Sequence, residues 1–430
     1  MLPGIDTFKP ERDNILRMNT REEYDVVIIG AGPAGLFCAL QTSAGRVLVL
    51  EKQGTAGKKL LIAGSGQCNI THEGEIRDFL NHYGDHGKFL RPALLSFSNR
   101  DLIGFFRDRG LSMTVAKGNK VFPETLRSQD VLGILIEECR EKGVTLRLSE
   151  EVVSVGRAGE RFEVVSRKGT IVSDLLVIAT GGVSYPSTGS TGDGYRFLQS
   201  LGHTVTEIAP ALTPVYVASY PFSEQAGISF QEIEISLFRE GKKVREHRGD
   251  VLLTHEGVSG PGILDLSRYI RAGDVIELSF VPLREREEFS RRFIQLLQKN
   301  PTKSVKNLLL EYDLPERLVK RILEYAGIPV EITGAHLTRE ARNVLIDHLT
   351  RFPLVVERLG NFREAMATRG GVSLDEVDPK SMESRLVPGL YCIGEVLDID
   401  GDTGGYNLQA AFSTGALAGR SIAKKCSSRR

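Results

Sequence analysis

A group of three glycines near the start of the chain could bind the phosphates of a dinucleotide. An apolar run, 26–29, leads into the pattern G-x-G-x-x-G, made by Gly30, Ala31, Gly32, Pro33, Ala34 and Gly35. In this pattern the first glycine allows a tight turn, the second lets a pyrophosphate approach the backbone, and the third lets a helix pack against the strand. That helix would point free N–H groups and a partial positive charge at the phosphates.

Glu51 is placed to bind the ribose of the same ligand. It follows a second apolar run, 47–50, and lies 21 residues after Gly30. An acid about 20 residues beyond the first glycine accepts hydrogen bonds from ribose hydroxyls. A glycine-rich turn in an unrelated α/β unit is the alternative, but strand, glycine turn and helix occur here in the required order. The sequence therefore predicts an ADP-binding βαβ unit.

The segment 57–69 is rich in glycine and small polar residues, which suits a backbone that wraps closely around a ligand. Within it, Lys58 or Lys59 could meet a phosphate as a point charge. Cys68 has no second cysteine before Cys139, so a dithiol redox centre is not expected. We expect Cys68 to pack in the core or in the wall of the cofactor site.

A second glycine turn, Thr180-Gly181-Gly182, follows the apolar run 175–179. Open α/β sheets bind ligands at the carboxyl ends of their strands, so this turn is expected beside the first one. The loop 184–194, dense in small residues and hydroxyls, comes next. Its composition fits the entrance for a substrate and a plain linker equally well.

A third glycine turn lies near the C-terminus. Gly394-Glu395 ends an apolar strand, an acidic loop follows at 398–402, and Gly404-Gly405-Tyr406-Asn407 opens a helix from Leu408 to about Lys424. The acids would repel a phosphate, so this helix N-terminus suits a neutral ring that gains negative charge on reduction. Flavin is such a ring, anionic at its N1–C2=O edge when reduced.

Segments 30–69, 180–182 and 394–408 are therefore expected to converge on one FAD. A nicotinamide dehydrogenase normally uses one compact Rossmann unit and does not need the far C-terminus. No second G-x-G-x-x-G follows a strand elsewhere in the chain. A separate NAD(P) domain is not expected, and NAD(P)H as a transient reductant would have to visit the flavin pocket.

Composition excludes several classes of protein. The 430 residues carry 55 Lys plus Arg and 55 Asp plus Glu, so there is no overall bias toward nucleic acid or anionic membrane. Five scattered cysteines without a C-x-x-C motif argue against a disulfide framework and a metal site and favour a reducing, cytoplasmic location. No run approaches 18 apolar residues, and 1–21 lacks the apolar core of a signal peptide.

The elements that must position these motifs follow from hydrophobic periodicity. Strands are expected at 26–29, 47–50, 144–148, 152–155, 161–166, 170–172, 175–179, 231–238, 251–254 and 275–280. Helices are expected at 89–110, 128–142, 195–201, 285–299, 305–312, 315–326, 339–350 and 408–424. The order indicates an α/β domain interrupted by an antiparallel β subdomain and a helical stretch. We expect the parts at 22–208 and 353–424 (FAD-binding), 209–284 (inserted β) and 285–352 (inserted helical).

From Tyr24 to Gly419 the chain resembles the bacterial YhiN-like flavoproteins, also called aminoacetone-oxidase-like FAD-binding proteins. The resemblance rests on the segments 57–69, 179–194, 254–261, 370–372, 394–401 and 404–409. It implies FAD in a glutathione-reductase-type Rossmann domain, interrupted by a β-barrel-like piece and a small helical piece. This agrees with the shifts in composition.

The chain departs from the family pattern at two positions. Gln67 stands where many relatives carry Arg, and His72 stands where Asn is frequent. The loss of Arg at 67 removes a charged contact, which puts a shared substrate preference in doubt. Family members are linked to the reduction of a bile-acid dienone, the oxidation of aminoacetone and the reduction of uridine in ribosomal RNA. The resemblance implies hydride exchange at flavin, with reduction of a conjugated C=C bond as the commonest theme.

That chemistry needs a proton donor within reach of the substrate. Tyr185 in the loop after the second glycine turn and His255 in the Thr-His-Glu-Gly segment are the candidates. A purely structural role, as a wall of the flavin site or as a turn residue, is the alternative for each.

The leading prediction is an FAD-dependent oxidoreductase that acts on a small molecule. The alternatives are an RNA-modifying flavoenzyme docked through the basic residues of 242–248 and 284–320, an amine oxidase, and a flavin redox sensor without turnover. No membrane and no metal are expected. Besides the first glycine motif, the expected cofactor contacts are Glu51, Lys52, Lys59, Gly64, Ser65, Gly66, Asn69, Val153, Thr180, Gly181, Gly182, Gly394, Glu395, Gly404, Gly405, Tyr406, Asn407 and Leu408.

Overall fold

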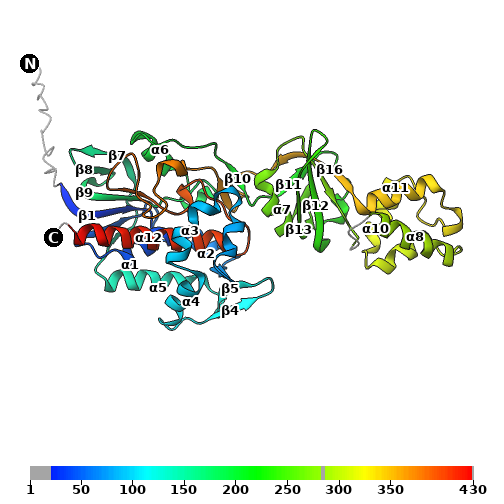
Figure 1. Cartoon of the computed structure of the whole chain (residues 1–430), viewed down its shortest axis with the longest axis horizontal. Coiled ribbons are helices and arrows are strands. Elements are labelled where there is room, and N and C mark those ends of the chain that lie inside the picture. The colour runs from blue at the N-terminus through cyan, green and yellow to red at the C-terminus, as the bar shows by residue number, and fades with distance from the viewer. Residues whose placement is uncertain (1–20, 282–285, 429–430) are drawn as a thin grey trace, which may run out of the picture.

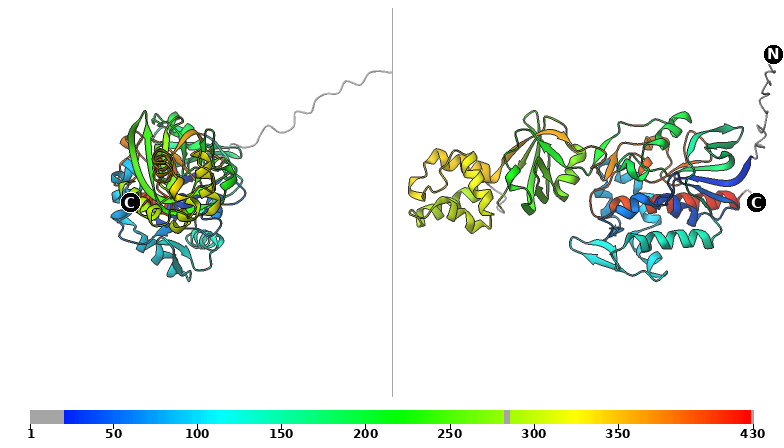
Figure 2. Two further views of the ribbon diagram at one scale, coloured as in Figure 1. Left: turned by 90° about the vertical axis from the view of Figure 1, so that its right-hand side faces the viewer. Right: turned by 180° about the vertical axis from the view of Figure 1, so that it is seen from behind.

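The protein consists of three parts arranged in a row along its longest axis (Figure 1). The structure, a computed structural model, describes residues 21–281 and 286–428. The N-terminal segment 1–21, in which no signal peptide is expected, therefore lies outside the described residues, apart from Arg21. The large α/β domain contains both ends of the described chain, the barrel lies in the middle, and the helical part lies at the far end (Figure 2).

The α/β domain is built on a seven-stranded sheet with the strand order β6-β2-β1-β9-β8-β7, in which β18 also pairs with β9. Its strands are β1 (Glu22–Ile29), β2 (Val47–Leu50), β6 (Thr145–Arg147), β7 (Val152–Ala158), β8 (Arg161–Ser166), β9 (Gly169–Ile178) and β18 (Leu390–Cys392). The neighbours β6, β2, β1, β9 and β18 run parallel, whereas β7 and β8 form an antiparallel extension. The central parallel strands β1, β2 and β9 contain continuous apolar runs, 26–29, 47–50 and 175–178, because both faces of the sheet are covered there. The runs 170–172 and 175–179, expected as two strands, form the single strand β9.

The helices α1 (Pro33–Gln41) and α12 (Tyr406–Ser427) pack side by side in the same direction under this sheet. Their backbones can approach closely because Gly415 and Gly419 have no side chain. A Cβ atom at Gly415 would lie 2.5 Å from the Ala34 carbonyl oxygen, and one at Gly419 would lie 2.6 Å from the Cys38 carbonyl oxygen. Gly415 lies against Ala34, the second residue of α1, and Tyr406 precedes Gly415 by nine residues, so α12 begins about 12 Å beyond the start of α1 at 1.5 Å per residue. Two helix N-termini therefore point into the same region at different depths.

Further elements cover the sheet and extend from it. They are α2 (Lys58–Ile62), α3 (Gly87–Ser96), α4 (Asn99–Arg107), α5 (Ser128–Glu141), α6 (Asp193–Ser200) and the three-stranded sheet of β3 (Thr71–His72), β5 (Lys120–Pro123) and β4 (Met113–Ala116). The helical run 89–110 is split into α3 and α4, because Ser98 caps a new helix with a capping box to Asp101. The β4–β5 hairpin was not predicted.

The inserted β part is a closed barrel with the order β11-β14-β13-β12-β15-β16. Its strands are β11 (Val215–Val217), β12 (Ser229–Arg239), β13 (Lys242–Leu253), β14 (Gly257–Ser259), β15 (Val275–Leu278) and β16 (Phe352–Leu359). β13 is longer than the predicted strand 251–254. The prediction missed its first half because that half carries exposed charged residues and lacks an apolar pattern. β16 pairs with β15 and β11, so the barrel extends past residue 353, where the sequence placed the return to the α/β domain.

The helical part contains α8 (Arg286–Lys299), α9 (Val305–Leu309), α10 (Glu316–Tyr325) and α11 (Arg339–Thr350). Thr338 caps α11 as its sequence predicts, with its hydroxyl accepting from the Ala341 N–H at 3.2 Å. Residues 282–285, which include the predicted start of the first helix and the predicted domain boundary, lie outside the described residues. A short ribbon of β10 (Ala209–Ala211) and β17 (Ala367–Arg369) joins the barrel to the α/β domain.

Candidate active site

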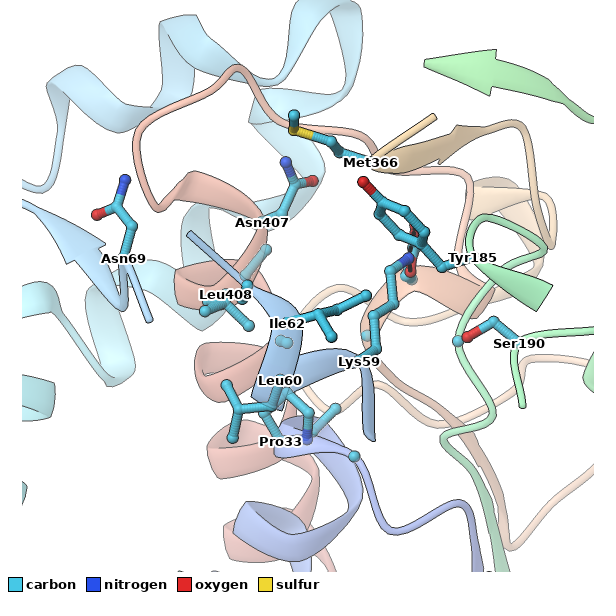
Figure 3. A pocket seen from close by; sticks show the side chains of 18 of the residues that line it. Pro33, Lys59, Leu60, Ile62, Asn69, Tyr185, Ser190, Met366, Asn407 and Leu408 are labelled. Carbon is cyan, nitrogen blue, oxygen red and sulfur yellow. Dashed lines mark hydrogen bonds and ion pairs between the residues drawn. The ribbon is translucent and has the colours of Figure 1, made fainter. Parts of the chain in front are cut away.

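A cavity of about 780 Å³ lies at the carboxyl ends of the parallel strands. Its size is within the range of ligand and cofactor sites. All three predicted segments contribute to its walls, and Figure 3 shows the start of α1, the α2 segment, the loop around Tyr185 and the start of α12 facing the same space. Of the predicted contacts, those that line the cavity are Gly30, Gly32, Pro33, Ala34, Glu51, Lys59, Gly64, Ser65, Asn69, Thr180, Gly181, Gly394, Glu395, Gly404, Gly405, Asn407 and Leu408.

The glycine turn at the start of α1 has the shape that a pyrophosphate requires. Gly30 has φ +108°, and a Cβ there would lie 2.4 Å from the Ala179 carbonyl oxygen. At Gly35 a Cβ would lie 2.0 Å from the Gly30 carbonyl oxygen, so this glycine allows α1 to pack on the strand. A Cβ at Gly32 would meet nothing within 4 Å. The space beside Gly32, at the N-terminus of α1, is therefore open to a phosphate.

Glu51 is held in place by the glycine turn itself. Its two carboxylate oxygens accept hydrogen bonds from the backbone N–H groups of Ala31, at 3.0 Å, and Gln53, at 2.9 Å. Each oxygen keeps a further lone pair for a hydroxyl donor. A carboxylate with this geometry at the end of β2 fits the two hydroxyls of a ribose.

Lys59 pairs with a carboxylate across the cavity. Its ammonium lies 2.7 Å from Glu395 Oε2 and 3.1 Å from Ser184 Oγ. Glu395 also accepts from the Thr368 N–H at 2.9 Å. The pair connects α2 to the short turn Gly394–Val396 and neutralises both charges in the middle of the cavity. Its position fits a neutral part of the ligand better than a phosphate.

The start of α12 forms the opposite end of the cavity. Gly405 has φ +98°, and a Cβ there would lie 2.5 Å from the Thr71 backbone. With the Asn69 amide oriented to satisfy both of its ends, its nitrogen donates to the Thr71 carbonyl and its oxygen accepts from the Gly405 N–H. Asn407 closes the turn through two hydrogen bonds to the Gly401 backbone. The first N–H groups of α12, which have no partner within the helix, therefore face the cavity.

Two acids of the loop before α12 are paired with a cation from the barrel. Arg268, which is 6% exposed, lies 2.7 Å from Asp402 Oδ1 and 3.0 Å from Asp400 Oδ2. His82 Nδ1 lies 2.9 Å from the other oxygen of Asp402. Burial raises the pKa of Asp400, which the positive charge of Arg268 partly offsets. Sequence reasoning missed Arg268: the run of acids indicates that a cation is needed but not which of the 55 basic residues supplies it.

Four of the predicted contacts support the site from behind its walls. Ala31 donates its N–H to Glu51, Gly35 packs on the strand, and Gly182 lies against Thr368, whose Oγ1 would be 2.3 Å from a Cβ at Gly182. Tyr406 is buried and stacks on His82, with ring centroids 4.1 Å apart.

Three other predicted contacts lie away from the main cavity. Lys52 pairs with Asp193 beside a smaller cavity of about 40 Å³. Gly66 does not line either cavity. The side chain of Val153 is 42% exposed, and its neighbour Val152 lines the smaller cavity.

The two candidate proton donors occupy very different places. Tyr185 lines the cavity, and Figure 3 shows its ring between Lys59 and Met366. Its backbone is held with φ +52° by a hydrogen bond from its N–H to the Phe362 carbonyl, at 2.8 Å. His255 is exposed in the turn between β13 and β14 and does not line the cavity. The structure therefore does not bring His255 to the site.

The cavity has an apolar wall that the sequence did not predict. It is formed by Leu212, Pro261, Leu264 and Met366, which come from the barrel and its connections to the α/β domain. Pro261 and Leu264 belong to α7 (Pro261–Leu266). The family-like segment 254–261 ends at the first residue of α7. The position of α7 beside the cofactor domain, however, depends on the closed barrel.

Cys68 is fully buried, and burial raises the pKa of its thiol to about 12. It therefore stays protonated at neutral pH, as expected of a packing residue. Among the described residues no helix is long and apolar enough to cross a bilayer, and no group of three or more His, Cys, Asp or Glu is arranged to hold a metal ion.

Comparison with known proteins places this geometry in a family. Residues 24–421 match the family described as "HI0933-like protein Rossmann domain". The chain is 34% identical over 422 residues, 94% of its length, to the whole of the ribosomal RNA dihydrouridine synthase of Escherichia coli K12. It is 30% identical over 408 residues to the 3-dehydro-bile acid delta(4,6)-reductase of Clostridium scindens, covering 93% of this chain and 98% of that one.

Among solved structures, the FrdA subunit of E. coli quinol fumarate reductase superposes with a TM-score of 0.50 at 15% identity, covering 95% of this chain and 71% of that chain. This likeness concerns the fold alone. The extent of the family match and the identity to full-length relatives confirm the resemblance inferred from the sequence. The chain belongs to the HI0933-like family of flavoprotein oxidoreductases and carries their Rossmann-type FAD-binding domain.

Proposed function

We propose that the protein reduces a C=C bond conjugated to a carbonyl group, using FAD as its cofactor. The observation that carries this proposal is the apolar wall of Leu212, Pro261, Leu264 and Met366, which lines the same cavity as the glycine turns and the start of α12. FAD held along the glycine turns would leave this wall for a second, largely apolar or flat molecule. A site that closes between two domains also excludes water from the reacting atoms.

The names of the two relatives support the same type of reaction on two different substrates. One is named as a reductase of a dehydro-bile acid and the other as a synthase of dihydrouridine in ribosomal RNA. A dienone and a uracil ring both contain a C=C bond conjugated to a carbonyl. Reduction of such a bond is therefore the activity that fits both names.

FAD would supply the hydride that adds to the β-carbon of the substrate. The remaining tasks fall to residues of the chain. The turns at Gly32 and Gly405 orient the cofactor, the Lys59–Glu395 pair fixes the central wall, and the barrel excludes water. We propose that the Tyr185 hydroxyl, on the cavity wall, gives the α-carbon the proton that completes the reduction, so that one hydride and one proton are added.

NAD(P)H is proposed as the electron donor. The chain has no second G-x-G-x-x-G motif after a strand, so the nicotinamide would have to enter the same cavity before the substrate. This predicts ping-pong kinetics, in which the donor and the substrate compete for one space.

The first test is spectroscopic. Purified protein should be yellow and release FAD on denaturation, and anaerobic mixing with NADPH should bleach the flavin. Reoxidation by a 3-oxo-4,6-diene bile acid in the absence of oxygen would support the proposal, and Tyr185→Phe should slow this step by about 10²-fold. Protein that cannot be reconstituted with FAD would contradict the proposal. Flavin that is reduced but never reoxidised by an unsaturated carbonyl compound would instead indicate a redox sensor.

A uracil base in ribosomal RNA is the second candidate substrate. The E. coli relative is named for this activity, and β13 presents Lys242, Lys243, Arg245 and Arg248 on an exposed surface. Binding through phosphate contacts should weaken steeply with salt. Ribosomal RNA from a strain without the gene should lack one dihydrouridine and regain it on incubation with the reduced holoprotein; an unchanged dihydrouridine content would remove this candidate.

A further inference from the structure

A carboxyl group of the barrel lies directly behind a hydroxyl group of the cavity wall. Thr403 lines the cavity just before the start of α12. Asp265 on α7 binds it twice: Oδ1 accepts from the Thr403 N–H at 2.6 Å, and Oδ2 is 3.3 Å from Thr403 Oγ1. These two residues belong to different domains, so the contact exists only when the barrel is docked on the α/β domain.

The surroundings of Asp265 on balance oppose its ionisation. Burial raises its pKa, and the negative charge of Asp402 raises it further. The hydrogen bonds of Thr403 and the positive charge of Arg268 lower the pKa, but by less than burial and Asp402 raise it. The pKa of Asp265 is therefore well above the ordinary value of a carboxyl. The neighbouring charges are themselves engaged, Asp402 with His82 and Arg268, and Arg268 also with Asp400.

Two further titratable groups lie near this cluster. The pKa of Tyr406 on α12 is raised by burial and by both Asp402 and Asp265. Burial lowers the pKa of His247 on β13, so its imidazole is mostly neutral near pH 7 and does not supply a positive charge to the cluster. Asp265 therefore retains its proton up to a pH much closer to neutral than an exposed aspartate does.

The protonation state of Asp265 decides where the hydroxyl hydrogen of Thr403 points. An ionised carboxylate is only an acceptor, so it attracts the Thr403 hydrogen toward itself and away from the cavity. A protonated carboxyl donates through Oδ2 to Thr403 Oγ1 while Oδ1 still accepts from the backbone N–H. The Thr403 hydrogen is then free to point into the cavity.

We propose that Thr403 donates this hydrogen bond to the carbonyl oxygen of the substrate, and that Asp265 is the positioning residue that directs it there. The inference rests on the proposed reduction of a conjugated C=C bond. When hydride adds to the β-carbon, the C=C electron pair moves to join the α-carbon to the carbonyl carbon, and negative charge collects on oxygen.

Thr403 stabilises that enolate oxygen, and the enolate then collapses as the α-carbon takes up a proton from Tyr185. The positive end of α12, which begins three residues later, acts on the oxygen in the same sense. The substrate class that fits is a ketone or imide whose oxygen reaches Thr403 while its alkene lies over the cofactor.

Substitutions at Thr403 test the donor. A hydrogen bond to a developing oxyanion is worth about 10² to 10³ in kcat, so Thr403→Val should lower kcat by that factor with a small change in KM. Thr403→Ser keeps the hydroxyl and should recover most of the rate. Thr206→Val is the matched control, because Thr206 also binds an aspartate, Asp398 at 2.9 Å, but does not line the cavity. A Thr403→Val enzyme with the rate of the wild type would overturn the proposal.

The substitution Asp265→Asn tests the positioning role, because an amide can accept from the Thr403 N–H and donate to its hydroxyl at every pH. In the wild type kcat should fall as pH rises through the pKa of Asp265, since the ionised form withdraws the Thr403 hydrogen. In Asp265→Asn that fall should disappear, so that the variant is faster than the wild type at high pH. A structural role predicts a slower enzyme with the same pH profile, and that result would refute the assignment.

A binding measurement keeps the inference separate from the proposed reaction. The probe is 2,4-dinitrophenol added to the holoprotein. This phenol is ionised throughout the pH range of the kinetic test, so it offers a phenolate oxygen in place of the enolate oxygen. Its binding can be followed by absorbance. The affinity should fall about tenfold or more in Thr403→Val and should lose its pH dependence in Asp265→Asn. If these shifts occur but no unsaturated carbonyl compound is reduced, the proposed function fails and the oxyanion site stands. If reduction occurs but neither variant changes the binding or the pH profile, the oxyanion site fails.

Discussion

Gly32 and Gly35 lie one turn apart at the start of α1 but face different surroundings. A Cβ at Gly35 would overlap the Gly30 carbonyl oxygen at 2.0 Å, whereas a Cβ at Gly32 would enter open space. Gly32 also has φ −80°, which any residue can adopt. The glycine at 35 therefore serves the fold, and the glycine at 32 serves the ligand.

This difference leads to a prediction for a matched pair of substitutions. Gly32→Ala should fold with a free energy of unfolding within about 1 kcal/mol of the wild type, the cost of a poorer N-cap, but should bind FAD at least tenfold more weakly. Gly35→Ala should destabilise the protein itself by several kcal/mol, because backbone atoms must move apart. Urea unfolding of the FAD-free protein and titration with FAD measure the two effects. Equal affinity for FAD in Gly32→Ala would show that the pyrophosphate does not lie there.

At this scale the sequence predicts residues whose role depends on local spacing. The glycines and Glu51 have fixed positions along one strand, turn and helix, so a single motif is enough to place them. Arg268, Asp265 and Thr403 are brought together by a barrel that begins and ends far from them in sequence. No local pattern carries that information. His255 shows the converse, because a family-like segment made it a candidate proton donor but it lies in an exposed turn.

At the scale of elements, α7 and the helical turn that follows it, Ser267–Tyr269, make polar contacts with the loop before α12 and so connect the barrel to the α/β domain. Arg268 bridges Asp400 and Asp402 and donates to the Asp400 carbonyl at 3.1 Å, while Asp265 binds Thr403. Arg369 on β17 in turn donates to the Arg268 carbonyl at 2.6 Å. The loop that shapes the ring end of the cavity is thus fixed from outside its own domain.

Removal of Arg268 should therefore destabilise the protein in a pH-dependent way. Arg268→Ala leaves the buried carboxylate of Asp400 without its cation and leaves the partly exposed Asp402 with His82 alone, which costs roughly 3 to 5 kcal/mol. The pKa of Asp400, which burial already raises, would rise further without the charge of Arg268, so the folded state would bind more protons than the unfolded state. Stability then falls as pH rises through that raised pKa and is partly recovered at lower pH. Urea unfolding at a series of pH values measures this slope.

Two further variants separate the buried pair from a general loss of charge. Arg292 pairs with Glu288 on α8 at an exposed surface, so Arg292→Ala should cost at most about 0.5 kcal/mol at every pH. Adding Asp400→Asn to Arg268→Ala should restore part of the lost stability. If the Arg268 and Arg292 variants were equally stable, the buried bridge would contribute nothing.

The elements that the sequence predicts well are those with one clear period. The central parallel strands β1, β2 and β9 contain continuous apolar runs, and α5 and α11 agree with their predicted ranges to within a residue or two. The first half of β13 is charged on both sides because it extends beyond the core, so no alternation marks it. Pro353 argues against a strand at β16, because proline cannot donate a hydrogen bond within a sheet. Closure of the barrel nevertheless pairs β16 with β11 on one side and β15 on the other.

At the scale of the whole molecule, the three parts contain two main cores. One is the core of the α/β domain, and the other runs without interruption from the barrel into the helical part. Phe352 of β16 shows the connection, since its ring lies 4.7 Å from Phe222 on the barrel side and 5.0 Å from Tyr325 of α10. Barrel and helices, which the sequence separates by composition, should therefore unfold as one unit.

This arrangement predicts two thermal transitions, only one of which responds strongly to FAD. The glycine turns, Glu51 and the start of α12 all belong to the α/β domain, so bound FAD should raise the transition of that domain. At a free FAD concentration 100 times the Kd the gain is about 2.7 kcal/mol. Calorimetry with and without FAD measures the shift. The second transition should move little, because the barrel offers the cavity mainly the apolar side chains of α7 and its flanks.

Hydrogen exchange must assign the transitions, since the chain has no tryptophan to report on either core. Amides of β1, β9 and α12 should gain protection with FAD, and amides of α10 and β15 should not. Amides of α7 are the informative intermediate case, because α7 belongs to the barrel but is anchored on the loop before α12. If FAD orders that loop, α7 should gain protection in the wild type and lose this gain in Arg268→Ala. A single transition that shifts as a whole with FAD would show instead that the docked barrel and the cofactor domain unfold together.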